Sequence, residues 1–159
     1  MKFTTKSEVI LIILKITLIY LYLYSNKLFN TNIKICLCTI GKNENSYIKE
    51  FVTYYKELGY NHIYLYDNND IDNEKFEDII YNEINKGFVT LINYRGIRGE
   101  NINPQLEAYK DCYEKYNMKY DWLSFFDIDE YLELIPKTLK IHDFLSILIK
   151  DIHNAKILK

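Results

Sequence analysis

Cysteine is scarce in this sequence and blocks of basic residues are absent, and each feature excludes a class of function. The three cysteines are Cys36, Cys38 and Cys112, and no cysteine or histidine spacing resembles that of a zinc site. Cys36 and Cys38 lie two apart in a predicted strand, so they share one face and cannot easily bridge each other. We therefore expect small buried apolar side chains and no disulfide framework.

The charge balance is close to neutral, with 20 lysine and arginine residues against 22 aspartate and glutamate residues and a formal net charge of −2. Without a basic patch to meet phosphates, the chain is expected to bind no nucleic acid. Hydrophobic residues make up 48% of the 159 residues, a proportion typical of a folded domain with a real core. The sequence also lacks internal repeats and low-complexity tracts, which leaves one ordinary domain as the expectation.

From residue 33 onward, strand patterns and helix patterns alternate. The predicted strands, rich in β-branched and aromatic residues, are 33–40, 62–66 and 88–92. The expected inward faces of the three following helices are Ile48, Phe51, Val52, Tyr55 and Leu58; Phe76, Ile79, Ile80 and Ile84; and Leu106, Tyr109, Tyr113 and Tyr116. Ser46 is the expected N-cap of the first helix, Gly59 its end, and Pro104 the first turn of the third. This alternation predicts an α/β fold, a sandwich of a mostly parallel sheet and flanking helices.

A short apolar run at 121–126 ends in three carboxylates, those of Asp127, Asp129 and Glu130. A run of this length predicts a strand buried on both faces of a parallel sheet. Ligands of open α/β sheets bind beyond the carboxyl ends of such strands, and two carboxylates one residue apart can share a hard cation. Mg²⁺ or Mn²⁺ commonly bridges carboxylates to substrate phosphates. The stretch therefore indicates a protein that acts on a nucleotide diphosphate with the help of a metal ion.

An Asp-x-Asp triplet alone is weak support, because most such pairs are solvated turns. Haloacid-dehalogenase-like phosphatases also use this triplet, but at the end of the first strand and with a Thr or Val two residues after the second Asp. Here the triplet follows the fourth predicted strand and Tyr131 occupies that position. Rossmann-type dinucleotide binding is disfavoured as well, since no Gly-x-Gly-x-x-Gly follows the first strand.

Three predicted loops bring polar residues to one edge of the sheet, namely residues 39–45, 67–70 and 127–130. Each contains an acidic residue with amide or hydroxyl neighbours. Asn and Asp are favoured in turns for purely structural reasons, so each loop alone is uninformative. Together they predict a pocket for a base, a ribose and a metal-bound diphosphate.

Several segments of the chain also occur in an order and spacing that is found in a known protein family. They are Gly41-Lys42-Asn43-Glu44, Tyr47 to Phe51 with Tyr54-Tyr55 and Leu58-Gly59, His62 to Asn69, Gln105 with Ala108-Tyr109 and Asp111-Cys112, and Trp122 to Glu130. From residue 33 to about 134, this pattern resembles the GT-A-type glycosyltransferases of family 2 and the related family 92 group. The resemblance implies sugar transfer from a nucleotide-sugar donor to a glycan or another hydroxyl acceptor, with a divalent cation, Mn²⁺ or Mg²⁺.

The same resemblance assigns expected roles. The positions near the nucleobase and ribose are Thr39 at the strand end, Asn43, Glu44 and Asp67. Asp127 is expected to face the ribose and the metal, and Asp129 to be the main metal ligand. Independently of the resemblance, Arg95 and Arg98, in the loop after the third strand, are candidates for phosphate contacts because guanidinium forks suit phosphate; exposed loop charges are the alternative account. The catalytic base has no assignment.

Residues 1–32 are expected to form an N-terminal hydrophobic anchor and stem. Val9 to Tyr24 are almost wholly apolar, interrupted by Lys15 and Thr17, and no small-residue cleavage site follows. We expect an uncleaved single-pass anchor; a helix on the membrane surface or in the core of a cytoplasmic protein is the alternative.

Residues 33–159 make up the expected nucleotide-sugar-binding domain. Only 29 residues follow Glu130, fewer than the multi-stranded acceptor half that this class of fold uses. Glu133 and Asp143 lie there, and neither belongs to a pattern that identifies a general base. Two hypotheses therefore remain, a metal-dependent glycosyltransferase and a truncated or degenerate nucleotide-sugar-binding module without turnover.

Overall fold

A computed structural model describes residues 33–96 and 103–157, with side chains up to residue 149. Residues 33–141 form one compact unit, and from His142 the helix α5 (Ile141–Ile157) belongs to a separate unit. The predicted anchor at 9–24 and Arg98 lie outside the described residues. Of the helices that are described, none is both long and apolar enough to cross a membrane.

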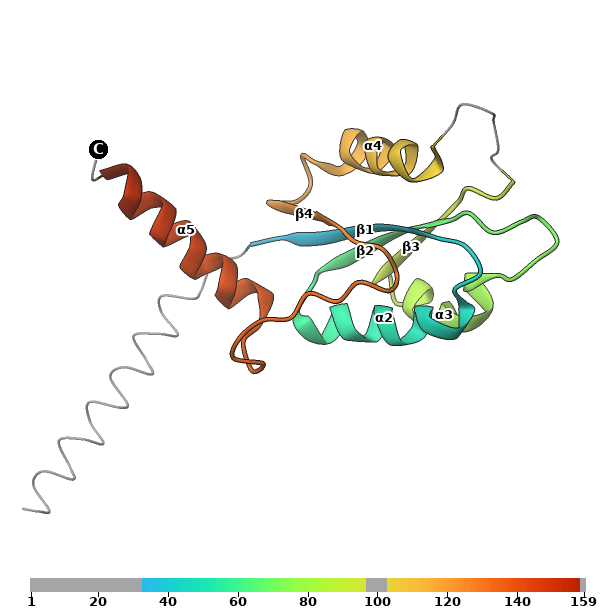
Figure 1. Ribbon diagram of the computed structural model, residues 1–159, viewed down its shortest axis with the longest axis horizontal. Coiled ribbons are helices and arrows are strands. Elements are labelled where there is room, and N and C mark those ends of the chain that lie inside the picture. Colours follow the sequence, from blue (N-terminus) through green and yellow to red (C-terminus); the bar gives the residue numbers. More distant parts are fainter. Residues whose placement is uncertain (1–32, 97–102, 158–159) are drawn as a thin grey trace, which may run out of the picture. The chain divides into compact units, whose positions relative to one another are not determined.

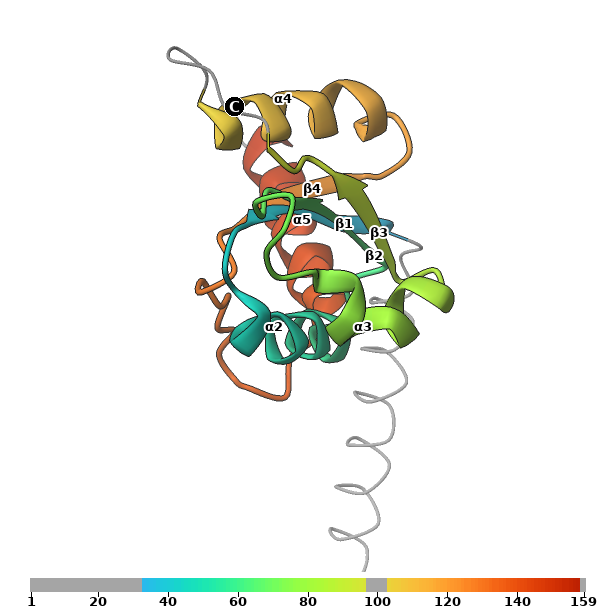
Figure 2. The same ribbon diagram turned by 90° about the vertical axis from the view of Figure 1, so that its right-hand side faces the viewer.

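The compact unit contains a parallel sheet of four strands in the order β3-β2-β1-β4. The strands are β1 (Ile35–Gly41), β2 (His62–Asp67), β3 (Val89–Asn93) and β4 (Trp122–Phe125). The helices that alternate with them are α2 (Asn45–Leu58), α3 (Phe76–Asn85) and α4 (Pro104–Tyr116). α2 and α3 cover one face and α4 the other, as Figures 1 and 2 show. The predicted α/β fold with a parallel sheet is confirmed, with strand ends shifted by one or two residues.

The carboxylate strand β4 differs from its prediction of burial on both faces. It pairs with β1 only and ends the strand order, so all four of its residues are half-buried. The enclosed strands are the two internal ones: β1 is buried from Ile35 to Thr39 between β2 and β4, and β2 is buried from Ile63 to Asp67 between β3 and β1. A short apolar run therefore indicated a strand correctly but did not reveal whether the strand was central.

Helix α2 has the predicted core face, with Ile48, Phe51, Val52 and Tyr55 buried. Its expected N-cap was wrong, because the helix begins at Asn45 and Glu44 occupies the cap position without a side-chain cap hydrogen bond. Its end at Gly59 is confirmed: this glycine has a φ of 105°, in the left-handed region that closes helices.

The predicted inward face of helix α4 is correct in part: Tyr109 and Tyr116 pack against the core, whereas the other two predicted residues do not. Leu106 and Tyr113 are 64% and 58% exposed, whereas Ala108 and Cys112 are fully buried. Cys112 joins Cys36 and Cys38 of β1 in one core cluster, so the burial expected for all three cysteines is confirmed. Small side chains let a helix backbone approach a sheet closely, and here they define the buried stripe. Burial and the nearby Cys112 raise the pKa of the Cys36 thiol to about 12.

Helix α3 buries Phe76 and Ile80 as predicted, but Ile79 is 38% exposed. The backbone at Ile80 departs from helical geometry, with φ −114° and ψ 28°, and this kink changes which residues follow one another on a face. Consecutive apolar residues at 79 and 80 gave no signal of that break.

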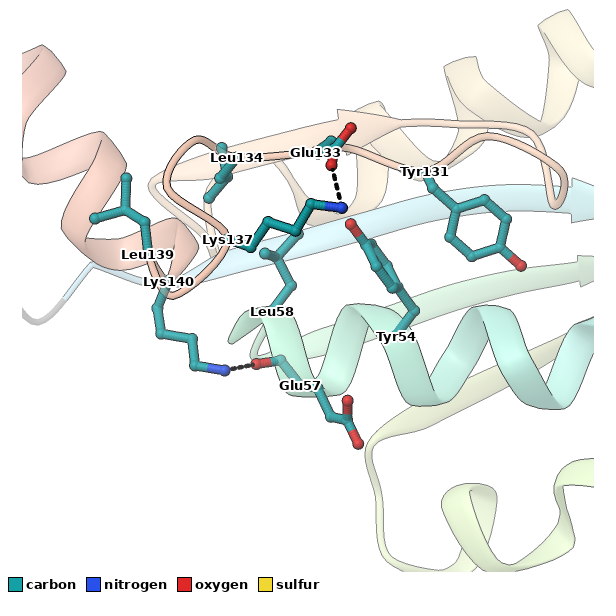
Figure 3. A pocket seen from close by; sticks show the side chains of 9 residues that line it. All are labelled: Tyr54, Glu57, Leu58, Tyr131, Glu133, Leu134, Lys137, Leu139 and Lys140. Carbon is teal, nitrogen blue, oxygen red and sulfur yellow. Dashed lines mark hydrogen bonds and ion pairs between the residues drawn. The ribbon is translucent and has the colours of Figure 1, made fainter.

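After β4 the chain runs back along α2, and residues 131–134 form no strand. The Tyr54 hydroxyl donates to the Leu132 carbonyl at 2.7 Å, and the Tyr55 hydroxyl donates to the Glu130 carbonyl at 3.0 Å. A cavity of about 410 Å³ remains between this segment and α2, lined by Tyr54, Tyr131 and the Glu133–Lys137 ion pair among others (Figure 3).

The buried face of α4 can be tested by two substitutions. Ala108→Leu should lower the free energy of unfolding by about 1–3 kcal/mol, because the added carbons have no space between α4 and the sheet. Tyr113→Gln should change it by about 0.5 kcal/mol or less, because that side chain is mostly solvated. Urea unfolding followed by circular dichroism measures both, and the opposite ranking would support the face predicted from periodicity.

Candidate functional site

A cleft of about 390 Å³ opens at the edge of the sheet where β1, β2 and β4 end. Its lining comes from the three loops after these strands and from the N-terminus of α4: Ile40, Gly41, Lys42, Glu44, Asn68, Asn103, Pro104, Gln105, Asp127, Ile128 and Asp129. We call it the carboxylate cleft, after Glu44, Asp127 and Asp129. The predicted meeting of the three loops is thus what the structure contains.

The side chain of Asp127 is oriented by two donors from α4. Gln105 Nε2 donates to Asp127 Oδ1 at 2.6 Å, and the Tyr109 hydroxyl donates to the same oxygen at 3.0 Å. Burial, with a further contribution from the Asp127 carboxylate, raises the pKa of Tyr109 to about 12, so this phenol stays protonated and keeps donating. Both donors bind Oδ1. No described residue donates to Oδ2, so the lone pairs of that oxygen remain available to a ligand.

Between the two aspartates, Ile128 points in the opposite direction, into the core. It is 3% exposed, and a Cβ added to Gly41 would collide with its Cδ1 atom and come within 3.0 Å of Phe76 Cζ. Glycine at position 41 therefore leaves the space that Ile128 fills. With Ile128 fixed in this way, Asp127 and Asp129 on either side are directed to the cleft.

The carboxylates of the cleft repel one another. The pKa of Glu44 is raised above its ordinary value, first by burial and then by the negative charges of Asp129 and Glu74. Half-buried acids that disfavour their own ionisation are stabilised by a cation placed among them.

The residues present fit a divalent cation that is shared with a phosphate ligand. Among the described residues, no group of three or more His, Cys, Asp or Glu side chains is close enough to hold an ion unaided. Mg²⁺ and Mn²⁺ prefer oxygen ligands, and Mg²⁺ is usually held by one or two carboxylates together with waters and substrate phosphates. Asp127 and Asp129 supply such a partial set.

Two features of the cleft lining would suit phosphates. The N-terminus of α4 lies at the cleft, capped by Asn103, whose side chain accepts from the backbone N–H groups of Gln105 and Leu106 at 3.1 and 3.2 Å. Helix N-termini favour anions. The Lys42 ammonium also lines the cleft, where it forms an ion pair with Asp70 at 3.1 Å.

Four of the predicted nucleotide-binding residues lie outside the lining of the cleft, and two of them, Thr39 and Asn43, lie in the loop and strand behind it. Thr39 is fully buried two residues before the end of β1, and its hydroxyl has no hydrogen-bond partner among the described residues. Asn43 has a φ of 60°; its backbone N–H donates to Asn69 Oδ1 at 2.6 Å and its Oδ1 accepts from Asn73 at 3.0 Å. Both are therefore parts of the framework behind the cleft.

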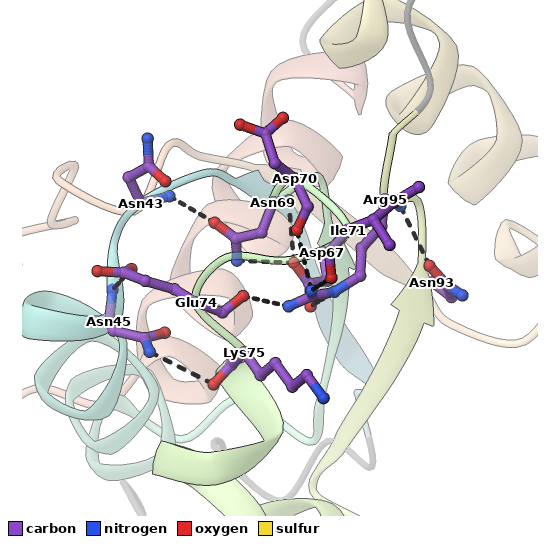
Figure 4. Close-up of polar contacts among 10 residues, drawn as sticks. All are labelled: Asn43, Asn45, Asp67, Asn69, Asp70, Ile71, Glu74, Lys75, Asn93 and Arg95. Atoms are coloured by element: carbon purple, nitrogen blue, oxygen red, sulfur yellow. Dashed lines mark hydrogen bonds and ion pairs between the residues drawn. The ribbon is translucent and has the colours of Figure 1, made fainter.

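Asp67 and Arg95 form an ion pair with each other, which neither expectation included. Arg95 Nε lies 2.9 Å from Asp67 Oδ2, with side chains only 14% and 4% exposed (Figure 4). They line a separate cavity of about 730 Å³ beside α3 and β3. This cavity is larger than the carboxylate cleft, but the cleft contains Glu44, Asp127 and Asp129.

Gln105, Tyr109 and the Gly41–Ile128 contact were not assigned roles from the sequence. Gln105 and Tyr109 are four residues apart at the start of a helix, a spacing that places both side chains on one face, and this was the available signal. The contact of Gly41 with Ile128 joins residues 87 apart in the chain, which no local pattern could reveal.

Comparison with known proteins gives a family match over most of the chain. The sequence model of glycosyltransferase family 92 matches residues 31–155. A glycosyltransferase family 92 protein of Ricinus communis is 25% identical over 114 residues, which are 69% of this chain and 19% of that protein. Family members of Arabidopsis thaliana and of Oryza sativa subsp. japonica are 28% and 24% identical, over 62% and 70% of this chain and 16% and 18% of theirs.

This chain therefore spans less than a fifth of the length of these relatives. No solved structure matches it.

The packing of Ile128 against Gly41 can be tested by a double-mutant cycle. Gly41→Ala should lower the free energy of unfolding by about 1–3 kcal/mol, because the new methyl group displaces Ile128. Ile128→Val removes the colliding Cδ1 atom and alone should cost about 0.5–1.5 kcal/mol. The two losses should combine to less than their sum in the double variant. Chemical denaturation measures all three variants, and simple additivity would contradict the proposed packing.

Proposed function

The chain belongs to glycosyltransferase family 92, and from this we propose that it binds a nucleotide-sugar donor and a divalent cation for transfer of the sugar to an acceptor hydroxyl. The carboxylate cleft carries this proposal. It combines the carboxylates of Asp127, Asp129 and Glu44 with an anion-favouring helix N-terminus in one space. A nucleoside diphosphate with its cation has the matching distribution of charge.

In this proposal Asp129 and the Oδ2 atom of Asp127 hold Mn²⁺ or Mg²⁺. The cation would supply Lewis-acid stabilisation of the departing diphosphate. Gln105 and Tyr109 fix the rotamer of Asp127 by occupying its other oxygen. The α4 N-terminus and Lys42 would attract the phosphates, and Asn68, which lines the cleft, would hydrogen-bond a ribose or base.

We further propose that the fold is of the GT-A type. Its support is the order of elements, with three strand–helix alternations followed by a strand that ends in Asp-Ile-Asp.

A donor-binding module without turnover is the second candidate, and the position of Glu133 favours it. This residue is paired with Lys137 at 2.7 Å and lines the cavity beside α2 instead of the carboxylate cleft. Of the acidic side chains in the described part of the cleft, Asp127 and Asp129 are proposed to meet the cation, and Glu44 is expected near the nucleobase. A general base would then have to come from elsewhere in a longer protein.

The metal assignment predicts that Asp129→Asn lowers Mn²⁺-dependent affinity for UDP or GDP by about tenfold or more. The fold should persist, because Asp129 is exposed. Isothermal titration with each nucleotide, with and without Mn²⁺, measures the effect. Glu114→Gln, which removes one exposed charge from α4, is the matched control and should bind like the wild type. Equal affinity of Asp129→Asn and wild type would remove the metal ligand from the proposal.

Turnover separates the two candidates. Wild-type protein that binds UDP with Mn²⁺ and also hydrolyses a UDP-sugar would favour the transferase, whereas binding without hydrolysis across UDP- and GDP-sugars would favour the module.

We also propose that Val9 to Tyr24 anchor the protein in a membrane. The support is the apolar run itself, which resembles a short spanning segment. Carbonate extraction of membranes from expressing cells should leave the intact chain in the pellet, and a variant lacking residues 1–32 should move to the supernatant. Release of the intact chain by carbonate would contradict the anchor.

A further inference from the structure

The guanidinium group of Arg95 is committed to the loop that follows β2. Its Nε donates to Asp67 Oδ2, and its Nη1 donates to the carbonyls of Asp70 and Ile71 at 3.0 and 3.2 Å. Its Nη2 donates to the carbonyl of Glu74. One planar fork thus fixes both ends of the segment from Asp67 to Glu74.

Asp67 passes this constraint to Asn69. Its Oδ1 accepts from the backbone N–H of Asn69 at 3.0 Å and from the Asn69 amide at 2.7 Å. Asn69 is fully buried, so its side chain cannot exchange these partners for water. The side-chain oxygen of Asn69, Oδ1, accepts from the backbone N–H of Asn43 at 2.6 Å.

The loop after β1 receives these contacts on both sides of Glu44. Before it, Asn43 adopts a φ of 60°, in the left-handed region that asparagine tolerates better than most residues other than glycine. After it, the backbone N–H of Asn45 donates to Glu74 Oε2 at 3.1 Å. Figure 4 shows the contacts from Arg95 through Asp67 and Asn69 to Asn43, and those from Arg95 to Glu74 and from Glu74 to Asn45.

We infer that Arg95 and Asp67 are positioning residues that place Glu44 in the carboxylate cleft through Asn69 and Asn43, and that neither is a ligand of the nucleotide. The inference rests on the proposed function for the identity of that ligand. The charge of Arg95 is paired with the buried Asp67, and its Nη atoms donate to three backbone carbonyls. Few of its donors therefore remain for a phosphate. The pair also lines a different cavity from Glu44, so its effect on the cleft has to pass through the loops.

Arg95→Lys tests this arrangement with the charge of the buried pair retained. A lysine can still meet Asp67, but its single nitrogen cannot reach three carbonyls at once as the guanidinium fork does. Affinity for UDP in the presence of Mn²⁺ should fall about tenfold, the lower end of the range for residues that orient metal ligands. Lys115→Arg, in the exposed ion pair with Asp111, is the control and should retain wild-type affinity.

A double-mutant cycle with Glu44→Gln distinguishes positioning from direct contact. If Arg95 acts through Glu44, Arg95→Lys should cause little further loss of UDP affinity once Glu44 is already glutamine. A direct contact of Arg95 with the phosphates would instead make the two losses multiply, and that result would overturn the inference. Wild-type affinity in Arg95→Lys would overturn it as well.

Amide hydrogen exchange tests the link without any ligand. In Arg95→Lys the N–H of Asn43 should exchange faster than in the wild type, while amides in the middle of α2 keep their rates. Should Arg95→Lys fail to fold, Asp67→Asn combined with Arg95→Gln removes the buried charges but keeps a hydrogen-bonding pair, and the same acceleration is expected. Unchanged exchange at Asn43 would overturn the link alone, whereas failure of wild-type protein to bind UDP or GDP with Mn²⁺ would overturn the proposed function.

Discussion

The burial of one isoleucine between two aspartates is the constraint on which the rest of the site depends. Ile128 fills the space that Gly41 leaves open at the end of the neighbouring strand, so the chain cannot rotate there without exposing it. The carboxylates on either side are directed outward as a consequence. Apolar packing thus fixes the direction of charged groups at a place where those groups would otherwise separate.

In this cleft, the carboxylates that would favour a bound cation repel one another when no cation is present. Glu44 and Asp129 repel each other, as the raised pKa of Glu44 indicates, and no described lysine or arginine forms an ion pair with either of them. Ion pairs are placed beside the cleft instead, at Lys42–Asp70 and at Arg95–Asp67. Such a site is less stable when empty than a neutralised one, and a bound cation would recover that difference.

The strands and the element order followed from the sequence because short apolar runs separated by polar loops leave few other arrangements. The meeting of the three loops followed in turn, since parallel strands end at one edge. The face of helix α4 was predicted only in part: Tyr109 and Tyr116 pack against the core, but large residues dominated the pattern, whereas Ala108 and Cys112 define the close contact. The partner of Arg95 could not be predicted, because Asp67 lies 28 residues away on another strand and nothing local connects them.

The enclosure of all three thiols has a practical consequence for spectroscopy. Cys36, Cys38 and Cys112 are free but lie between the sheet and α4, and burial keeps the thiol of Cys36 protonated at neutral pH. Maleimide and spin-label reagents attack exposed thiolates, so the three native cysteines should react little with them. A single cysteine introduced on the rim of the cleft could then carry a fluorophore or nitroxide without prior removal of the natural ones.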